Sequence, residues 1–243
     1  MIAEAPSGDL VPGVMTEYMT DDWGMFVRSA GTLARFRSAY QDVEVHDSVP
    51  FGKLFRLDGH FMTSERDEFF YHENMIHVPA LAHPRPERAL IVGGGDGGSA
   101  EELLKYPSMR SVTIAEIDKT VIDISREHLQ AVHRGALDDP RVTIVQDDVC
   151  DVIARERELD AILLDVDNGP EWASFRSNAR LYDARGLAAA HRALASGGIY
   201  AVWSGYPADA FVGRLERAQF RASTVLLKER GKVQARAYIG KKY

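Results

Sequence analysis

The pattern of hydrophobic and polar positions changes along the chain. Within residues 23–62, short stretches rich in aromatic and β-branched residues are separated by turn signals, and four of them predict strands: FVRSAG, TLARFRSAY, QDVEVHDSV and GKLFRLDG. Residues 1–21 are mixed and polar, which is typical of a loosely held tail. We therefore expect a tail over 1–21 and a β-meander domain over 22–63. That domain is too small to bury a core alone.

Residues 64–243 predict a larger α/β domain. Ser64 with Asp67 three positions later forms an approximate capping box, so a helix is expected over 64–79. From Arg88 onward strands alternate with helices, which indicates a mostly parallel sheet covered on both faces. The last two strands, ASTVLLKE and VQARAYIGK, have no helix between them and predict an antiparallel C-terminal hairpin. This ending is typical of nucleoside-dependent transferases rather than dehydrogenases.

A glycine-rich loop, IVGGGDGGSAEELL, follows the first strand of this domain. Gly93, Gly95 and Gly97 allow a tight turn and a close approach of a ligand to the backbone. Glu116 ends the next strand, 18 residues after Gly98, which is the spacing at which a carboxylate holds ribose hydroxyls. The loop therefore predicts a nucleotide or nucleoside site.

Asp96 lies inside the glycine loop, where its charge bears on the ligand. A carboxylate there would repel a diphosphate, which disfavours NAD and ATP, and would attract a cation. S-adenosyl compounds carry a sulfonium, and decarboxylated S-adenosylmethionine adds an ammonium without a carboxylate. The alternative is that Asp96 only caps the loop by bonding to nearby amides.

Other acidic residues end the following strands. Asp147 comes after the third strand, where an acceptor can meet an adenine amino group, and Asp165 and Asp167 come after the fourth. Ligands of open parallel sheets bind at these carboxyl ends. We therefore expect Asp96, Glu116, Asp147 and Asp165 to converge on one crevice.

The composition limits the class of protein, its expected location and its expected partners. Of 243 residues, 45% are hydrophobic and 27% charged, the balance of a globular protein, and no apolar run approaches the roughly 20 residues that span a bilayer. The sequence MIAEAPSGDL lacks a secretory signal, and the single cysteine, Cys150, suits a reducing cytoplasm. The net charge of −7 argues weakly against a nucleic-acid partner.

Several stretches between Ala39 and Asp148 resemble the spermidine synthase family, the polyamine aminopropyltransferases. They are AYQDVEV, LFRLDG, TSERDEFFYHENMIHVPAL, ALIVGGGDGGSAEE, AEIDKTVIDISREHL and DDPRVTIVQDD. The TSERDEFFYHE and VGGGDGG blocks are highly specific to that family. The resemblance implies an N-terminal β-meander domain on a Rossmann-like, class I methyltransferase-type core, usually in a dimer, so we expect a homodimer or higher homo-oligomer.

The resemblance also implies roles for residues on the donor side. Gln41 and His72 would line the site of decarboxylated S-adenosylmethionine, the expected co-substrate. Asp96 would hold its ammonium, Glu116 its ribose and Asp147 its adenine. The family's LDGxxQ pattern ends in Met62 here, which removes one polar donor contact.

The acceptor side departs from the family. Tyr71 would face the acceptor amine, Asp165 would be its base or anchor, and we expect Asp167 to hold a distal ammonium. The family's D-[ST]-[ST]-D-P-x-G-P segment reads DVDNGPEW here, with Asn168 at the second acid, and the later T-x-P-T-Y-x-x-G segment has no counterpart. Trp172, Phe175 and Tyr182 follow on a predicted lid and either wall the acceptor pocket or anchor the loop.

Three functions stay open at this point. The first is aminopropyl transfer to putrescine or a related amine, the second is methyl transfer from S-adenosylmethionine, and the third is a non-catalytic nucleoside-binding module. A metal is not expected, because His72 and His77 stand five residues apart and point in different directions around a helix.

Overall fold

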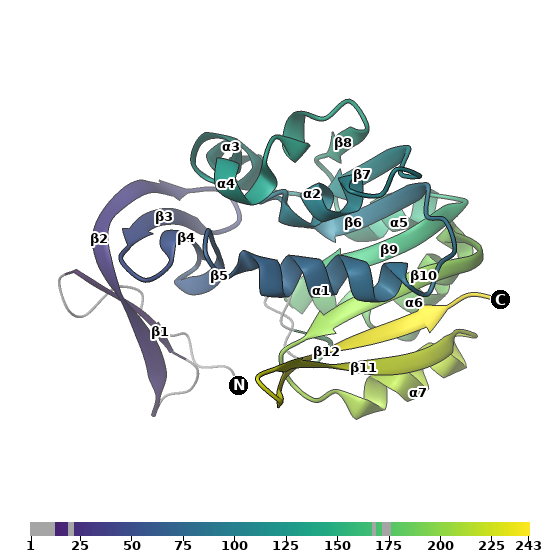
Figure 1. Cartoon of the computed structure of the whole chain (residues 1–243). Helices are drawn as coiled ribbons and strands as arrows, with labels where there is room; N and C mark the ends of the chain where they lie inside the picture. Colours follow the sequence, from purple (N-terminus) through teal and green to yellow (C-terminus); the bar gives the residue numbers. More distant parts are fainter. Residues whose placement is uncertain (1–12, 19–21, 167–168, 172–175) are drawn as a thin grey trace.

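The computed structural model describes residues 13–18, 22–166, 169–171 and 176–243. They form two sheets, an N-terminal antiparallel sheet of five strands and a C-terminal sheet of seven, which lie side by side and are connected by the long helix α1 (Glu68–Ala80; Figure 1). The α/β fold with a preceding small β domain, expected from the sequence, is confirmed.

The N-terminal sheet has the order β1-β2-β3-β4-β5. Its strands are β1 (Val14–Tyr18), β2 (Gly24–Arg37), β3 (Asp42–Ser48), β4 (Gly52–Leu57) and β5 (His60–Ser64). Two of the predicted strands, FVRSAG and TLARFRSAY, are one long strand, β2, whose register against β3 shifts twice. Strand β1 lies within the segment expected to be a tail, and pairs with β2 from Val14 to Tyr18.

Helix α1 begins later than the capping-box pattern predicts. Ser64 ends β5, and the helix starts at Glu68 after Asp67. The Ser64 hydroxyl donates a hydrogen bond to the Asp67 carboxylate, so the two polar residues bind each other across the turn between the strand and the helix. The helix then continues through Pro79 to Ala80.

The C-terminal sheet has the order β11-β12-β10-β9-β6-β7-β8. Its strands are β6 (Arg88–Gly93), β7 (Ser111–Ala115), β8 (Val142–Val145), β9 (Leu159–Asp165), β10 (Leu194–Ser204), β11 (Arg221–Glu229) and β12 (Lys232–Lys241). The five neighbouring strands β10, β9, β6, β7 and β8 pair in parallel. Strand β12 pairs antiparallel with both β10 and β11. The expected parallel sheet with an antiparallel C-terminal hairpin is therefore present.

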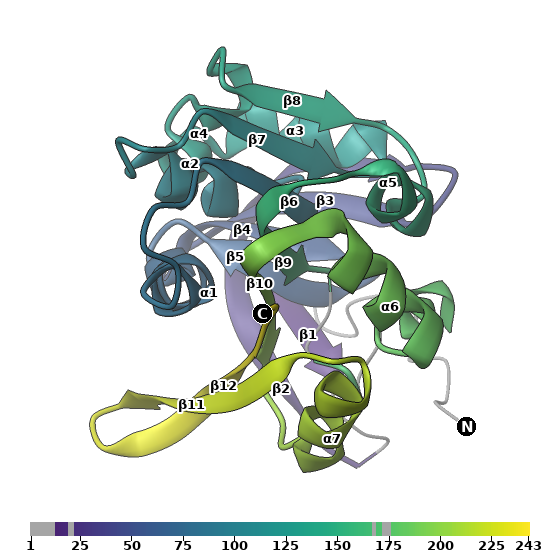
Figure 2. The same ribbon diagram turned by 90° about the vertical axis from the view of Figure 1, so that its right-hand side faces the viewer.

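Helices cover both faces of this sheet (Figure 2). They are α1, α2 (Gly98–Leu104), α3 (Lys119–His128), α4 (Gln130–His133), α5 (Val149–Arg155), α6 (Ala184–Ala193) and α7 (Asp209–Arg217), with 3₁₀ turns η1 (Ala136–Asp138) and η2 (Arg176–Leu181). Side chains alternate along β6, so that Leu90 packs with α5, α6 and α7, whereas Ile91 packs with α1 and α2. Among the described residues, no helix is long and apolar enough to cross a bilayer.

The N-terminal sheet shares a hydrophobic cluster with the C-terminal domain. Val43, Val45 and Phe55 of the small sheet pack against Val121 and Ile124 of α3. These side chains are at most 4% exposed. The small sheet therefore does not stand alone: its buried face is completed by a helix that follows the second strand of the core.

Candidate active site

The ends of β6 and β9 bring the glycine loop and Asp165 together. The two strands run parallel with Gly93 opposite Asp165, and Gly94 N–H donates to the carbonyl of Asp165 at 3.1 Å. Gly93 has a φ of 79°, and a Cβ at this position would lie 2.4 Å from the Asp165 carbonyl oxygen. Only glycine fits here, because both the positive φ and the contact exclude a side chain.

Two hydroxyl groups hold the Asp165 carboxylate. The Tyr71 hydroxyl donates to Oδ1 at 2.5 Å and the Ser99 hydroxyl donates to Oδ2 at 2.7 Å. Tyr71 comes from α1 and its ring lies edge-on against Trp203 of β10, with centroids 4.9 Å apart. Burial, followed by the charge of Asp165, raises the pKa of Tyr71 well above its usual value, so this side chain stays a donor.

His72, one residue after Tyr71, lies between two carboxylates. Its Nδ1 is 2.7 Å from Oε2 of Glu68, and its Nε2 is 3.4 Å from Oδ2 of Asp96. Burial alone would lower the pKa of His72, but Asp96 and Glu68 raise it well above its usual value. The raised pKa favours the imidazolium, whose Nδ1 bonds to Glu68 while Nε2 faces Asp96 without a hydrogen bond to any described residue.

Asp96 and Asp165 are close enough to affect each other. Ligand atoms of His72, Asp96 and Asp165 all lie within 4.8 Å of one another. Burial, then the charge of Asp96, raises the pKa of Asp165. Burial also opposes ionisation of Asp96, but His72 and the Gly98 amide, which donates to Oδ1 at 3.0 Å, bring the pKa of Asp96 below its usual range. Asp96 therefore caps the loop through the Gly98 amide and also carries a charge that lies close to Asp165.

Glu116 extends this acidic group toward the next strand. It follows β7, and a Cβ on Gly95 would lie 3.0 Å from its Cγ, so the loop glycine leaves room for this side chain. Its Oε1 accepts from the Asp118 amide at 2.9 Å. Burial is the main cause that raises the pKa of Glu116 to about 7.

Gln41 reaches the same region from the small sheet. It is 5% exposed, and its Nε2 donates to Oδ2 of Asp118 at 3.1 Å. The Ser38 hydroxyl donates to the same oxygen at 2.6 Å. Because Asp118 is also bonded to Glu116, the sequence-predicted residues Gln41 and Glu116 lie on two sides of one hydrogen-bonded corner.

The other two acids expected in the crevice have different outcomes. Asp147 follows β8 and pairs with Arg155 at 2.5 Å, with 42% of its side chain exposed. This ion pair lowers the pKa of Asp147. Asp167 and its neighbour Asn168 lie outside the described residues. Asp96, Glu116 and Asp165 are therefore grouped at the strand ends, with Asp147 farther out at the sheet edge.

Of the three aromatic residues on the predicted lid, only Tyr182 is described by the structure. Tyr182 is 2% exposed and packs edge-on against Phe211 in the core, with centroids 5.9 Å apart, so it anchors the segment. It also lies close enough to Tyr71 to contribute to the raised pKa of that residue. Trp172 and Phe175 lie outside the described residues.

Three side chains of this site were not singled out from the sequence. Ser99 binds Asp165, Glu68 binds His72, and Trp203 packs on Tyr71. Trp203 Nε1 is buried and lacks a hydrogen-bond partner within the described part of the chain. Glu68 occurs inside the family-specific block TSERDEFFYHE and Ser99 directly follows the block VGGGDGG, whereas Trp203 lies in a predicted strand that carries no such signal.

The arrangement suits an organic cation better than a metal ion. An imidazolium has no lone pair to offer a metal, and His77, the other histidine of the helix, instead pairs with Glu102 at 2.8 Å. Two partly buried carboxylates beside a glycine loop would attract a sulfonium or an ammonium. The absence of a metal stays a prediction.

Comparison with known families supports this interpretation. Residues 68–209 match the model of the spermine/spermidine synthase domain, and residues 13–65 match that of the spermidine synthase tetramerisation domain. The chain belongs to the spermine/spermidine synthase family.

Curated members of the spermine/spermidine synthase family show the extent of the likeness. A polyamine aminopropyltransferase of Nitrosomonas europaea is 42% identical over 184 residues, which is 75% of this chain and 55% of that protein. The polyamine aminopropyltransferase of Bacillus subtilis is 43% identical over 151 residues, 62% of this chain and 54% of that protein. The chain thus spans about half the length of the curated relatives it matches.

Solved structures of spermidine synthases share the fold over nearly the whole chain. The Thermotoga maritima enzyme has a TM-score of 0.82 at 28% identity, covering 95% of this chain and 79% of that one. A spermidine synthase in complex with the transition-state analogue AdoDATO has a TM-score of 0.84 at 28% identity, covering 99% of this chain and 84% of that one.

Proposed function

We propose that the protein is a polyamine aminopropyltransferase, which transfers the aminopropyl group of decarboxylated S-adenosylmethionine to putrescine or a related amine. The observation that carries this proposal is the Tyr71–Asp165–Asp96–His72 group beside the glycine loop, in which His72 is buried and the other three side chains are partly buried. It combines an acceptor for a proton with an anionic place for a cation. Membership of the family and the AdoDATO complex of a relative support the same reaction.

On the donor side, each acid would bind one part of the co-substrate. Asp96, held ionised by His72, binds the ammonium, and Glu116 accepts hydrogen bonds from the ribose hydroxyls. Asp147 receives the adenine amino group, and Gln41 closes the site from the small sheet. Gly93 and Gly95 let the nucleoside approach the backbone.

The transfer is a displacement at the carbon next to the sulfonium. The amine nitrogen donates its lone pair to that carbon, the carbon–sulfur bond breaks, and its electron pair goes to sulfur, which releases neutral methylthioadenosine. A free amine is mostly protonated at pH 7, so a carboxylate has to remove a proton, and Asp165 takes this role. Its raised pKa brings it closer to that of a useful base.

On the acceptor side, Tyr71 and Asp167 would hold the amine. Tyr71 fixes the orientation of Asp165 and faces the incoming amine. Asp167, assigned to a distal ammonium, keeps that role as a prediction. The replacement of the family's second acid by Asn168 implies that the acceptor is held differently from putrescine in a typical member.

The methyl-transfer alternative is tested by the product. The protein is incubated with putrescine and either decarboxylated S-adenosylmethionine or S-adenosylmethionine, and the nucleoside product is identified by mass spectrometry. Methylthioadenosine supports aminopropyl transfer, S-adenosylhomocysteine supports methyl transfer, and neither product supports a binding module. Asp96 favours the first outcome, because it opposes the carboxylate of S-adenosylmethionine.

Asp165→Asn tests the assignment of the base. We expect this variant to bind the decarboxylated donor with wild-type affinity and to lose at least about 100-fold in kcat, the usual effect of removing a general base. Donor binding is measured by calorimetry and turnover by methylthioadenosine release. A variant that binds the donor normally and turns over at the wild-type rate would refute the assignment.

Self-association and location complete the proposal. The match to a tetramerisation domain over 13–65 supports a homo-oligomer built through the N-terminal sheet. The cytoplasmic location stays a prediction that rests on the single cysteine.

A further inference from the structure

A buried carboxylate binds the nitrogen of His72 that does not face Asp96. Glu68, in the first turn of α1, is 7% exposed, and its Oε2 is 2.7 Å from Nδ1 of His72, four residues later on the same helix. The other nitrogen of His72 faces Asp96. Glu68, His72 and Asp96 therefore form a line from the interior of the protein to the glycine loop.

The backbone holds the His72 ring in this line. A Cβ built on Gly98 would lie 2.2 Å from Cε1 of His72, so the ring packs directly against the backbone at the start of α2. His72 is 1% exposed. With no room to turn, the ring keeps one nitrogen toward Glu68 and the other toward Asp96.

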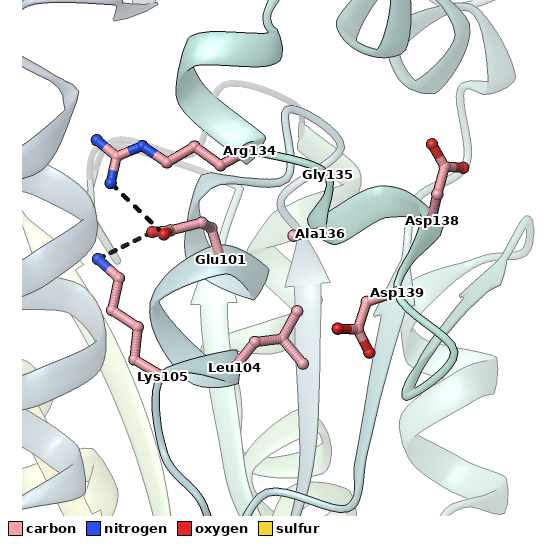
Figure 3. A pocket seen from close by; sticks show the side chains of 8 residues that line it. All are labelled: Glu101, Leu104, Lys105, Arg134, Gly135, Ala136, Asp138 and Asp139. Carbon is pink, nitrogen blue, oxygen red and sulfur yellow. Dashed lines mark ion pairs between the residues drawn. The ribbon is translucent and has the colours of Figure 1, made fainter.

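The second oxygen of Glu68 faces the protein surface. Its Oε1 is 3.8 Å from Nη2 of Arg134, and the same guanidinium is 3.5 Å from Glu101. Figure 3 shows Arg134 and Lys105 converging on Glu101 at a pocket of about 280 Å³. Because the side chain of Arg134 is 56% exposed, it screens Glu68 only in part, and His72 remains the main partner of that carboxylate.

The groups around His72 come from several elements. They are Glu68 and Tyr71 of α1, Asp96 of the glycine loop, Asp165 of β9, His133 of α4, and Arg134 after it. Burial lowers the pKa of His133, although Asp96 opposes this shift, so His133 favours its charged form less than His72 does. The charges that favour a protonated His72 thus exceed those that oppose it.

We propose that Glu68 is a positioning residue, which holds His72 as an imidazolium with its Nε2–H directed at Asp96 and so keeps Asp96 ionised beside Asp165. Two ionised carboxylates this close in a buried place repel each other. The imidazolium between them offsets that repulsion. The consequence for the donor rests on the proposed function, whereas the charge state of His72 does not.

The test follows the His72 ring and the carboxyl groups by NMR in the ligand-free protein, with ¹⁵N-histidine and ¹³C-aspartate labels. In the wild type we expect the titration of His72 to lie above that of a free imidazole. In Glu68→Gln, which keeps the shape but removes the charge, we expect its titration to move down by at least about one pH unit and that of Asp96 to move up. Glu68→Asp, which keeps the charge, restores most of the wild-type behaviour.

Glu101→Gln is the matched control. Glu101 shares Arg134 with Glu68 but makes its other ion pair with Lys105, on the surface, so His72 should titrate as in the wild type. An unchanged His72 titration in a folded Glu68→Gln variant, or an equal shift in Glu101→Gln, would overturn the proposal. If the shift appears but the wild type binds no decarboxylated donor, the role of Glu68 stands and the proposed function fails.

Discussion

Asp165 is placed where its proton affinity can be adjusted by single side chains. Burial and Asp96 raise its pKa, whereas His72 and the hydroxyls of Tyr71 and Ser99 lower it. The hydroxyls matter because they donate to the ionised form and lose most of that interaction on protonation. The pH at which the Asp165 carboxylate ionises is therefore set by its neighbours.

Ser99→Ala tests this balance. Loss of a hydrogen bond to a charged group costs about 1.5–3 kcal/mol, and one pKa unit corresponds to about 1.4 kcal/mol. The pKa of Asp165 should rise, because the ionised form loses a donor. We expect the acidic limb of kcat/KM, where activity falls as Asp165 takes up a proton, to move to higher pH by about one unit.

The control for this variant is Ser125→Ala. Ser125 of α3 also has a buried hydroxyl, but that hydroxyl has no hydrogen-bond partner among the described side chains. Its removal should leave the pH profile unchanged. An acidic limb that stays in place in Ser99→Ala would show that Asp165 does not govern it.

Glu116 lowers the free energy of unfolding of the ligand-free protein at high pH. Its pKa is raised from 4.5 to about 7, so the folded state binds this proton more tightly than the unfolded chain does. The stabilisation is complete below pH 4.5 and is lost as the pH rises through about 7. The maximal loss is about 3 kcal/mol, since each unit corresponds to about 1.4 kcal/mol.

Glu116→Gln should therefore stabilise the ligand-free protein. At pH 8 we expect its free energy of unfolding in urea to exceed that of the wild type by up to about 3 kcal/mol, with little difference at pH 4.5. Binding of the donor should weaken in the same variant, because the ribose loses its acceptor. A variant that is less stable than the wild type at pH 8 would contradict the raised pKa.

The sequence predicted several residues that the structure brings together, but not the contacts that hold them. Asp96 and Glu116 could be predicted because strand ends and a glycine loop leave a local pattern. The contact of Ser99 with Asp165 could not, since it joins α2 to the end of β9, 66 residues away. Glu68 and His72 are four residues apart on one helix, but that spacing alone does not show which of the two histidine nitrogens Glu68 binds or that the other faces Asp96.

At the scale of elements, the carboxylate of Asp118 connects the small sheet to α3. Asp118 caps α3 by accepting from the Thr120 amide at 2.9 Å, and its other oxygen accepts from Ser38 and Gln41. Asp118 is 2% exposed. The start of a core helix and a turn of the small sheet are thus fixed by the same side chain.

Asp118→Ala should cost more than the loss of an ordinary cap. A helix cap contributes about 1 kcal/mol, and leaving the buried amide of Gln41 without its partner adds about 1–3 kcal/mol. We expect a loss of about 2–4 kcal/mol in the free energy of unfolding. Asp183→Ala, which removes the exposed cap of α6, should cost only about 1 kcal/mol. Equal losses in the two variants would contradict the role of Asp118 in connecting the small sheet to α3.

The order of the core elements was predictable, but two boundaries in the small domain were not. Alternation of strands with helices fixed the parallel sheet, and the two successive final strands fixed the hairpin. Strand β2 was divided in two because the sequence RSAGTL resembles a turn, yet the strand passes through it with shifts in register. Pairing with β2 also orders residues 14–18, and such long-range pairing leaves little local signal.

At the scale of the whole molecule, the N-terminal sheet exposes large apolar side chains. In β2 and the turn before it, these are Trp23 (57% exposed), Met25 (45%), Phe26 (68%), Leu33 (44%) and Phe36 (55%). Figure 1 shows this sheet projecting from the α/β core beside the start of α1. Several exposed large apolar side chains on one strand are typical of an interface between proteins.

A second copy of the chain is the partner that the tetramerisation-domain match favours for this surface. Burying a phenylalanine side chain contributes about 1.5–3 kcal/mol, so Phe26→Ser with Phe36→Ser should raise the dissociation constant of the oligomer at least about 100-fold. Sedimentation equilibrium measures this change.

Leu81→Ser, at a side chain 87% exposed after α1, is the matched control and should leave the assembly intact. Because the exposed phenylalanines lie outside the Tyr71–Asp165 group, the double variant should still bind the donor. A wild-type chain that sediments as a monomer at all concentrations would exclude this interface.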